Sequence, residues 1–98
     1  MRLNPNVREL RERLCDSGIE FGENDGEYEG EDGELYHIEK TIIERDGHTH
    51  VISCSHVITP DNERVGVSKG WKFGFLELAT DDEDAVMVTV DEAVEAVS

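Results

Sequence analysis

The stretch LYHIEKTIIERDGHTHVISCSHVIT, residues 35–59, decides the fold. It contains two runs rich in β-branched and aromatic residues, and the pair Asp46-Gly47 lies between them. This dipeptide is the strongest short-range signal for a two-residue type I′ turn. The sequence therefore predicts an antiparallel hairpin with strands over 35–45 and 48–59.

The two-residue turn also fixes the register of the hairpin, because the residues on either side of it must pair. The predicted pairs are Arg45 with His48, Ile43 with His50, Thr41 with Ile52, Glu39 with Cys54, His37 with His56, and Leu35 with Ile58. The other face of the hairpin carries Tyr36, Ile38, Ile42, Val51 and Val57.

A helix is predicted before the hairpin, over residues 5–17. Asn4 is a suitable N-cap and Pro5 suits the first helical position. Gly18 can take the left-handed conformation that ends a helix, and Ile19 can then contact the last turn. One face of this helix carries the apolar residues Val7, Leu10 and Leu14. The remaining face is rich in Arg, and we expect it to be exposed.

Residues 22–34, GENDGEYEGEDGE, contain four glycines and no aliphatic residue. This composition predicts a loop or a ragged edge strand around Tyr28. After the hairpin, a turn is predicted at 60–62, and further strand at 65–67 and 70–78. We expect the aromatic residues of the last run to pack against the first helix; they are Trp71, Phe73 and Phe75.

The C-terminal part begins with a polar acidic break at 80–84, followed by a short strand over 85–89. Thr89 and Glu92 have the spacing of a capping box that opens a final helix through Val97. One continuous helix over 81–98 is the alternative, because Thr80 and Glu83 have the same spacing.

Together these elements predict a single α+β domain over residues 1–98. Its antiparallel sheet has three or four strands, with the N-terminal helix packed on it and a short C-terminal helix. A chain of this length can build only one modest core. The N-terminus lacks the apolar run of a signal peptide, and no segment is long and apolar enough to span a membrane. We expect a cytoplasmic protein with two free cysteines, Cys15 and Cys54.

The formal net charge of −15 is unevenly distributed along the chain. Residues 20–34 and 77–98 contain acidic residues without a single Lys or Arg, whereas the rest of the chain is nearly balanced. Such segments repel themselves in the compact state, so we expect their field to act on something outside the chain. Direct binding to nucleic acid is not expected, because phosphate would be repelled.

The densest cluster of metal-ligating residue types lies on one face of the hairpin. It consists of His37, Glu39, His48, His50, Cys54 and His56. These are suitable zinc ligands, which leaves a small zinc-binding domain as one alternative. Regular strands splay side chains apart, however, so we expect a partly exposed polar face with no metal or other cofactor. Nor does any recognisable oxyanion-hole motif make Cys54 a nucleophile. We therefore expect no enzyme activity.

Two segments resemble small proteins of phages and other mobile elements, of the anti-CRISPR and anti-restriction kind. They are LRERLCDSGIEF at 10–21 and VTVDEAVEAV at 88–97. The resemblance, with the acidity and the layout, implies an inhibitor that mimics nucleic acid. Such a protein would occupy the basic groove of a host nucleic-acid-binding defence complex.

The residues expected to contact this basic partner form two groups. They are Glu23, Asp25, Glu27, Glu29, Glu31 and Asp32 in the first, and Asp81, Asp82, Glu83 and Asp84 in the second. The protein itself is expected to be a monomer or a small homo-oligomer. Two further alternatives remain: a salt-adapted protein, and a protein-interaction module unrelated to nucleic acid.

Overall fold

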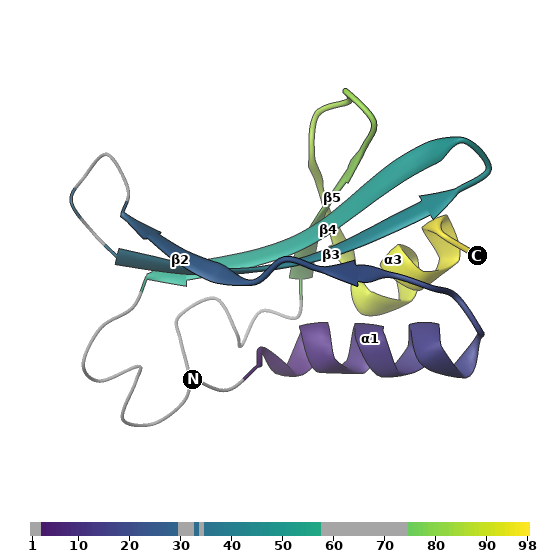
Figure 1. The fold of residues 1–98 in the computed structure, drawn as a ribbon, viewed down its shortest axis with the longest axis horizontal. Helices are drawn as coiled ribbons and strands as arrows, with labels where there is room; N and C mark the ends of the chain where they lie inside the picture. Colours follow the sequence, from purple (N-terminus) through teal and green to yellow (C-terminus); the bar gives the residue numbers. More distant parts are fainter. Residues whose placement is uncertain (1–2, 30–32, 34, 58–74) are drawn as a thin grey trace.

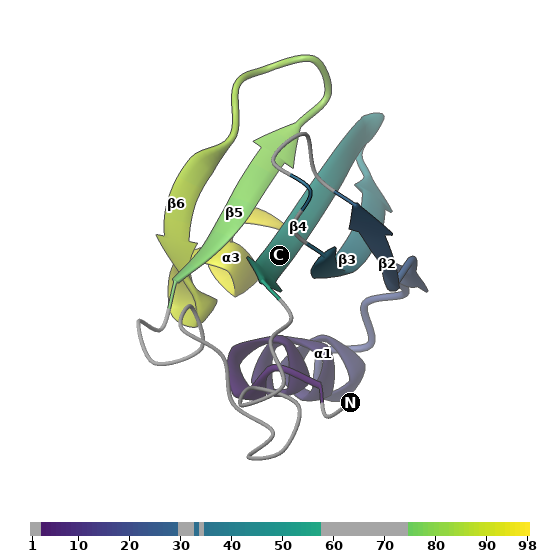
Figure 2. The same cartoon turned by 90° about the vertical axis from the view of Figure 1, so that its left-hand side faces the viewer.

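The computed structural model describes residues 3–29, 33, 35–57 and 75–98. It has an α+β architecture, with two helices on one face of an antiparallel sheet in the described part of the chain (Figures 1 and 2). The chain order is α1 (Pro5–Asp16), β1 (Gly22–Glu23), β2 (Gly26–Glu29), β3 (Leu35–Arg45), β4 (His48–Val57), β5 (Phe75–Thr80), β6 (Val86–Thr89) and α3 (Val90–Ala96).

The predicted hairpin is confirmed as β3 and β4, which form the centre of the sheet. Asp46 and Gly47 both have positive φ, 53° and 81°, as a type I′ turn requires. The pairs from Arg45 with His48 through His37 with His56 are those that the turn predicted. The expected pair of Leu35 with Ile58 lies outside the described residues.

The expected sheet of three or four strands was too small. The described residues form six strands in the order β1-β3-β4-β5-β6, with β2 also pairing with β3. The extra strands come from the acidic run after α1, whose edge-strand alternative is confirmed: Tyr28 of β2 pairs with Tyr36 of β3. Stacking of these two rings, with centroids 5.3 Å apart, supports a pairing that composition alone does not favour.

Both helices begin as their local sequences predict, and each ends one residue before the predicted end. Asn4 caps α1 by accepting a hydrogen bond from the Asn6 amide, 2.8 Å. Gly18 has φ 71°, and the Ile19 amide donates to the Leu14 carbonyl, which is the Schellman bond. The capping box of Thr89 and Glu92 opens α3. A continuous helix over 81–98 is therefore wrong, because β6 precedes that cap.

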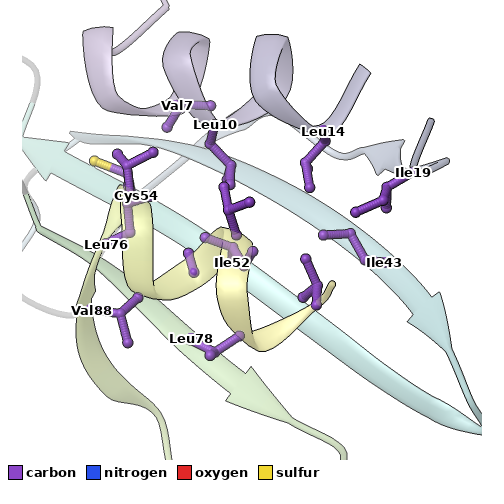
Figure 3. Close-up of a cluster of buried hydrophobic side chains, with 14 residues drawn as sticks. Val7, Leu10, Leu14, Ile19, Ile43, Ile52, Cys54, Leu76, Leu78 and Val88 are labelled. Atoms are coloured by element: carbon purple, nitrogen blue, oxygen red, sulfur yellow. The ribbon is translucent and has the colours of Figure 1, made fainter. Parts of the chain in front are cut away.

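The core lies between the sheet and the two helices (Figure 3). Val7, Leu10 and Leu14 of α1 are buried, as their helical spacing predicted. From the sheet they meet Ile43, Ile52, Leu76, Leu78 and Val88. The expected packing of Trp71, Phe73 and Phe75 on the first helix concerns side chains that lie outside the described part.

The middle of the hairpin face, which carries Glu39, Thr41 and Cys54, is buried under α1, so the expectation of a partly exposed face was wrong there and holds at the turn end, where His48 is exposed. Glu39 is 1% exposed and Thr41 is 0% exposed. Ile43 and Ile52 have the same orientation, so burying them against the helices also buries their polar neighbours. These polar groups are accommodated because α1 brings hydrogen-bonding side chains of its own, Asn4 and Arg11.

Candidate functional site

The first acidic segment is attached to the sheet through β1 and β2. Gly22 and Glu23 pair with Ile42 and Thr41, and β2 pairs further along β3. Glu27 and Glu29 of β2 are exposed. Glu23 is half exposed, and its carboxylate lies 3.7 Å from the Arg11 guanidinium. The predicted contact residues Glu31 and Asp32 lie outside the described residues.

Asp25 differs from its acidic neighbours because it is bound within the fold. Its two carboxylate oxygens accept hydrogen bonds from both terminal nitrogens of Arg11, at 2.9 and 3.1 Å. The Lys40 amide donates to the same carboxylate, 3.1 Å. The hydrogen bond from Arg11 is the main cause that lowers the pKa of Asp25 below its ordinary value. Asp25 therefore anchors the segment to α1 and β3.

Arg11 itself was expected on an exposed helix face, and that expectation was wrong. Only 9% of its side chain is exposed. Its Nε donates to Thr41 Oγ1, 3.0 Å, and one terminal nitrogen also donates to the Lys40 carbonyl, 3.1 Å. A buried guanidinium is tolerable here because it is paired with a carboxylate and its donors are satisfied.

The second acidic segment is the turn between β5 and β6, and it repeats this arrangement. Asp81 has φ 53° and is tied to the start of β4. Its amide donates to the Thr49 carbonyl, 2.8 Å, and its carboxylate accepts from the Thr49 amide, 2.9 Å. Asp82, Glu83 and Asp84 follow it and are exposed. One aspartate thus anchors each segment, and carboxylates beside it face solvent.

His48 contributes to the anchor of the second segment. Its Nδ1 lies 2.7 Å from the Asp81 carboxylate, and both side chains are open to solvent. This hydrogen bond raises the pKa of His48. The pKa of Asp81 is lowered, mainly by the Thr49 amide and then by His48. The contact joins the β3–β4 turn to the β5–β6 turn.

The two acidic segments lie on opposite edges of the sheet. β2 lies outside β3, beside the end at Leu35, whereas the turn after β5 lies beside Thr49. In Figure 1 they are separated by the central hairpin, with β2 on the left and the turn at the top. They therefore form two separate acidic surfaces. The first surface consists of Glu23, Glu27 and Glu29, and the second of Asp82, Glu83 and Asp84.

The His and Cys residues singled out as zinc ligands are divided between two places. His48 and His50 lie at the turn end of the hairpin, where His50 Nδ1 is 2.9 Å from Thr80 Oγ1. Glu39, Cys54 and His37 lie near the N-terminus of α1. Among the described residues no group of three or more potential ligands is arranged to hold a metal ion.

The buried polar cluster around Glu39 serves instead to seat the start of α1. The Asn4 amide donates to the Glu39 carboxylate, 3.0 Å, and Asn4 Nδ2 donates to Cys54 Sγ, 3.3 Å. His37 Nε2 lies 3.7 Å from the same carboxylate. Burial, followed by the charge of Glu39, raises the pKa of Cys54 to about 11, so its thiol stays protonated at neutral pH.

One exposed apolar site was missed by the sequence reasoning. Val86 and Met87 of β6 are 56% and 63% exposed, although they lie in a strand. A signal was present in the run AVMVTV at 85–90, which is uncharged and lies between two acidic groups.

None of the described helices has the length and apolar character needed to cross a membrane. A family model, a curated protein and a solved structure were each sought for this chain, and none matches.

Proposed function

We propose that the protein binds a positively charged partner through its acidic surfaces. In the form that the sequence favours, it inhibits a nucleic-acid-binding complex by occupying the basic groove. The observation that carries this proposal is the anchoring of each acidic segment. Asp25 and Asp81 are bonded within the fold, while the carboxylates of the two acidic surfaces extend from these fixed points.

Anchoring matters because binding is weakened by the entropy of ordering a flexible segment. The backbone of a strand or of a hydrogen-bonded turn is already ordered before binding, so only the side chains that it carries lose freedom. The carboxylates of the anchors, Asp25 and Asp81, are paired within the fold. The neighbouring carboxylates stay exposed, and their negative potential can attract a cation.

The overall charge is comparable to that of a nucleic acid. A formal net charge of −15 on a molecule 41 Å long is about one charge per 3 Å. Duplex DNA carries about one per 1.7 Å of axis, and each strand about one per 3.4 Å. Because the two acidic surfaces lie on opposite edges of the sheet, a basic groove that contacts one of them would meet only part of this charge.

A competition experiment tests the proposal. Nucleic-acid-binding proteins of a bacterial lysate are loaded on DNA-cellulose, and the purified protein is used to elute them. We expect release of a discrete protein at low salt, declining from about 50 to 200 mM salt as the ion-pair contribution is screened. The variant Asp82→Asn/Glu83→Gln/Asp84→Asn should release much less.

The matched control is Glu9→Gln/Glu20→Gln/Glu95→Gln, which removes the same charge from exposed positions elsewhere. It should behave as the wild type. Equal loss in both variants would show that total charge acts, without a shaped surface. Loss in neither variant would exclude the second acidic surface as the site, and Glu27→Gln/Glu29→Gln then tests the first.

A further inference from the structure

β6 forms one edge of the sheet, and within the described ranges no strand pairs with its outer side. Figure 2 shows it at the left of the sheet, with β5 on its inner side. Natural edge strands are commonly protected by Lys, Pro or a bulge. Residues 85–90 contain no charged residue and no proline.

The capping box identifies which backbone groups of β6 face outward. The Thr89 amide donates to Glu92 Oε1, 3.1 Å, so the pair Phe75–Thr89 is not hydrogen-bonded across the sheet. Hydrogen-bonded and non-hydrogen-bonded pairs alternate in an antiparallel ladder. Glu77–Met87 is then also a non-hydrogen-bonded pair, and the N–H and C=O of Met87 point to the free edge.

Side chains at this edge add an apolar contact. Val86 lies on the helix side of the sheet and Met87 on the opposite side, and both are largely exposed. An added strand could therefore make main-chain hydrogen bonds to Met87 and apolar contacts on both faces of the sheet.

Acidic residues flank β6 on both sides, and they favour a basic segment as the added strand. Asp82, Glu83 and Asp84 precede β6, and Asp91 and Glu92 follow it. All five are exposed, although Asp91 forms an ion pair with Arg13 and Glu92 accepts the Thr89 amide in the capping box. In a second copy of this chain, paired antiparallel through β6, residues 82–84 of one copy would lie beside residues 91–92 of the other. The carboxylates of the two copies would repel each other, and this repulsion opposes dimer formation. A segment with Lys or Arg at both ends would instead form favourable pairs.

We propose that the β6 edge binds an extended segment of another protein, with an apolar centre and basic ends, as an added strand. This inference rests on the proposed function, because it requires a positively charged partner. It adds the location and the mode of binding, which charge alone does not specify.

Met87→Pro is the decisive variant. It removes the outward N–H and keeps the charge of the protein, and an edge position whose N–H faces solvent is one that tolerates proline. Met87→Thr is the matched control, since it removes the apolar side chain but keeps the amide. The probe is a labelled peptide of alternating Thr and Val with two lysines at each end, measured by fluorescence anisotropy. A lysine-glycine peptide of equal charge reports binding by charge alone.

We expect the Thr-Val peptide to bind more tightly than the lysine-glycine peptide. Met87→Pro should weaken it by about tenfold, and Met87→Thr by less. In the wild type the Met87 amide should gain protection from hydrogen exchange on binding, a measurement that holds even if Met87→Pro fails to fold. Equal affinity of wild type and a folded Met87→Pro, or protection confined to other elements, overturns the proposal.

The outcomes separate this inference from the proposed function. If both peptides bind equally and Asp82→Asn/Glu83→Gln/Asp84→Asn weakens both, the acidic surface remains and the edge proposal fails. If neither peptide binds, the edge proposal fails, whereas the competition on DNA-cellulose still decides the proposed function. Concentration-dependent dimers that Met87→Pro abolishes would show that a second copy occupies the edge, which also overturns the proposal.

Discussion

Arg11 of α1 and Asp25, which lies between β1 and β2, form a two-pronged ion pair with N–O distances of 2.9 and 3.1 Å. This pair ties the first acidic segment to the body of the protein. Besides this pair, the segment is held by short edge pairing, by the stacking of Tyr28 on Tyr36 and by the Lys40 amide. The buried guanidinium of Arg11 therefore holds the Asp25 carboxylate in a fixed position.

Arg11→Met should destabilise the protein by about 2 to 3 kcal/mol, because Thr41 loses its donor and Asp25 keeps only the Lys40 amide and partial access to water. Urea unfolding measures the loss, and amide exchange in 22–29 should accelerate. Arg8→Met removes an exposed arginine of the same helix and should change stability by less than about 0.5 kcal/mol. Equal effects in the two variants would contradict the role of the pair.

His48 and Asp81 should make stability depend on pH. The folded pKa of His48 is raised above its ordinary value of 6.5, so its contribution is complete below that pH and is lost as the pH rises through the folded pKa. The folded pKa of Asp81 is lowered below 3.8, so its contribution is present above 3.8 and is lost on acidification through the folded value. The contact is therefore strongest between these two values.

An NMR titration should place the pKa of His48 above 6.5 in the wild type, and at a lower value in Asp81→Asn. Melting temperatures should fall more from about pH 5 to pH 8 in the wild type than in His48→Gln. A His48 titration that Asp81→Asn leaves unchanged would exclude the pair as its cause.

Glu39 should make stability depend on pH in the sense opposite to Asp81. Burial raises its folded pKa above 4.5, so the unfolded chain ionises first and the group costs stability as the pH rises above 4.5. Relative to Glu39→Gln, the wild type should lose melting temperature from about pH 4 to pH 7. Glu44→Gln, an exposed change on the same strand, should show no such slope relative to the wild type.

Asn4→Ala should destabilise the protein by about 1 to 2 kcal/mol. The variant removes the acceptor for the Asn6 amide and the donor to Cys54 Sγ, both at a fully buried position. Thermal or urea unfolding checks this, with the exposed Asn24→Ala as the comparison. A loss no greater than that of Asn24→Ala would show that water replaces the cap at no cost.

Short-range rules accounted for the elements whose signals lie within a few residues. The turn at Asp46-Gly47 fixed the hairpin register, and Asn4, Gly18 and Thr89 marked helix ends correctly. Each of these depends on backbone geometry and hydrogen bonds between residues at most five apart, which composition and spacing reveal directly.

The candidate site was only partly predictable, because short-range rules do not cover contacts between residues far apart in the sequence. Sequence identified the acidic segments, but their anchors are long-range: Arg11 lies 14 residues from Asp25, and His48 lies 33 residues from Asp81. Nothing local distinguishes Asp25 from the exposed Glu27, or Arg11 from the exposed Arg8. The sheet edge at Met87 likewise depends on strand order.

The sequence by itself determined that this chain forms a hairpin between two helices and that its charge lies in two segments. Only the tertiary structure decided which hairpin face is covered, which arginine is buried and that the acidic segments lie on opposite edges. Local backbone preferences specify a helix, strand or turn, but they do not determine which other elements it packs against. The choice of face depends on how Ile43, Ile52 and Leu10 meet across the core while Asn4 and Arg11 satisfy the polar groups buried with them.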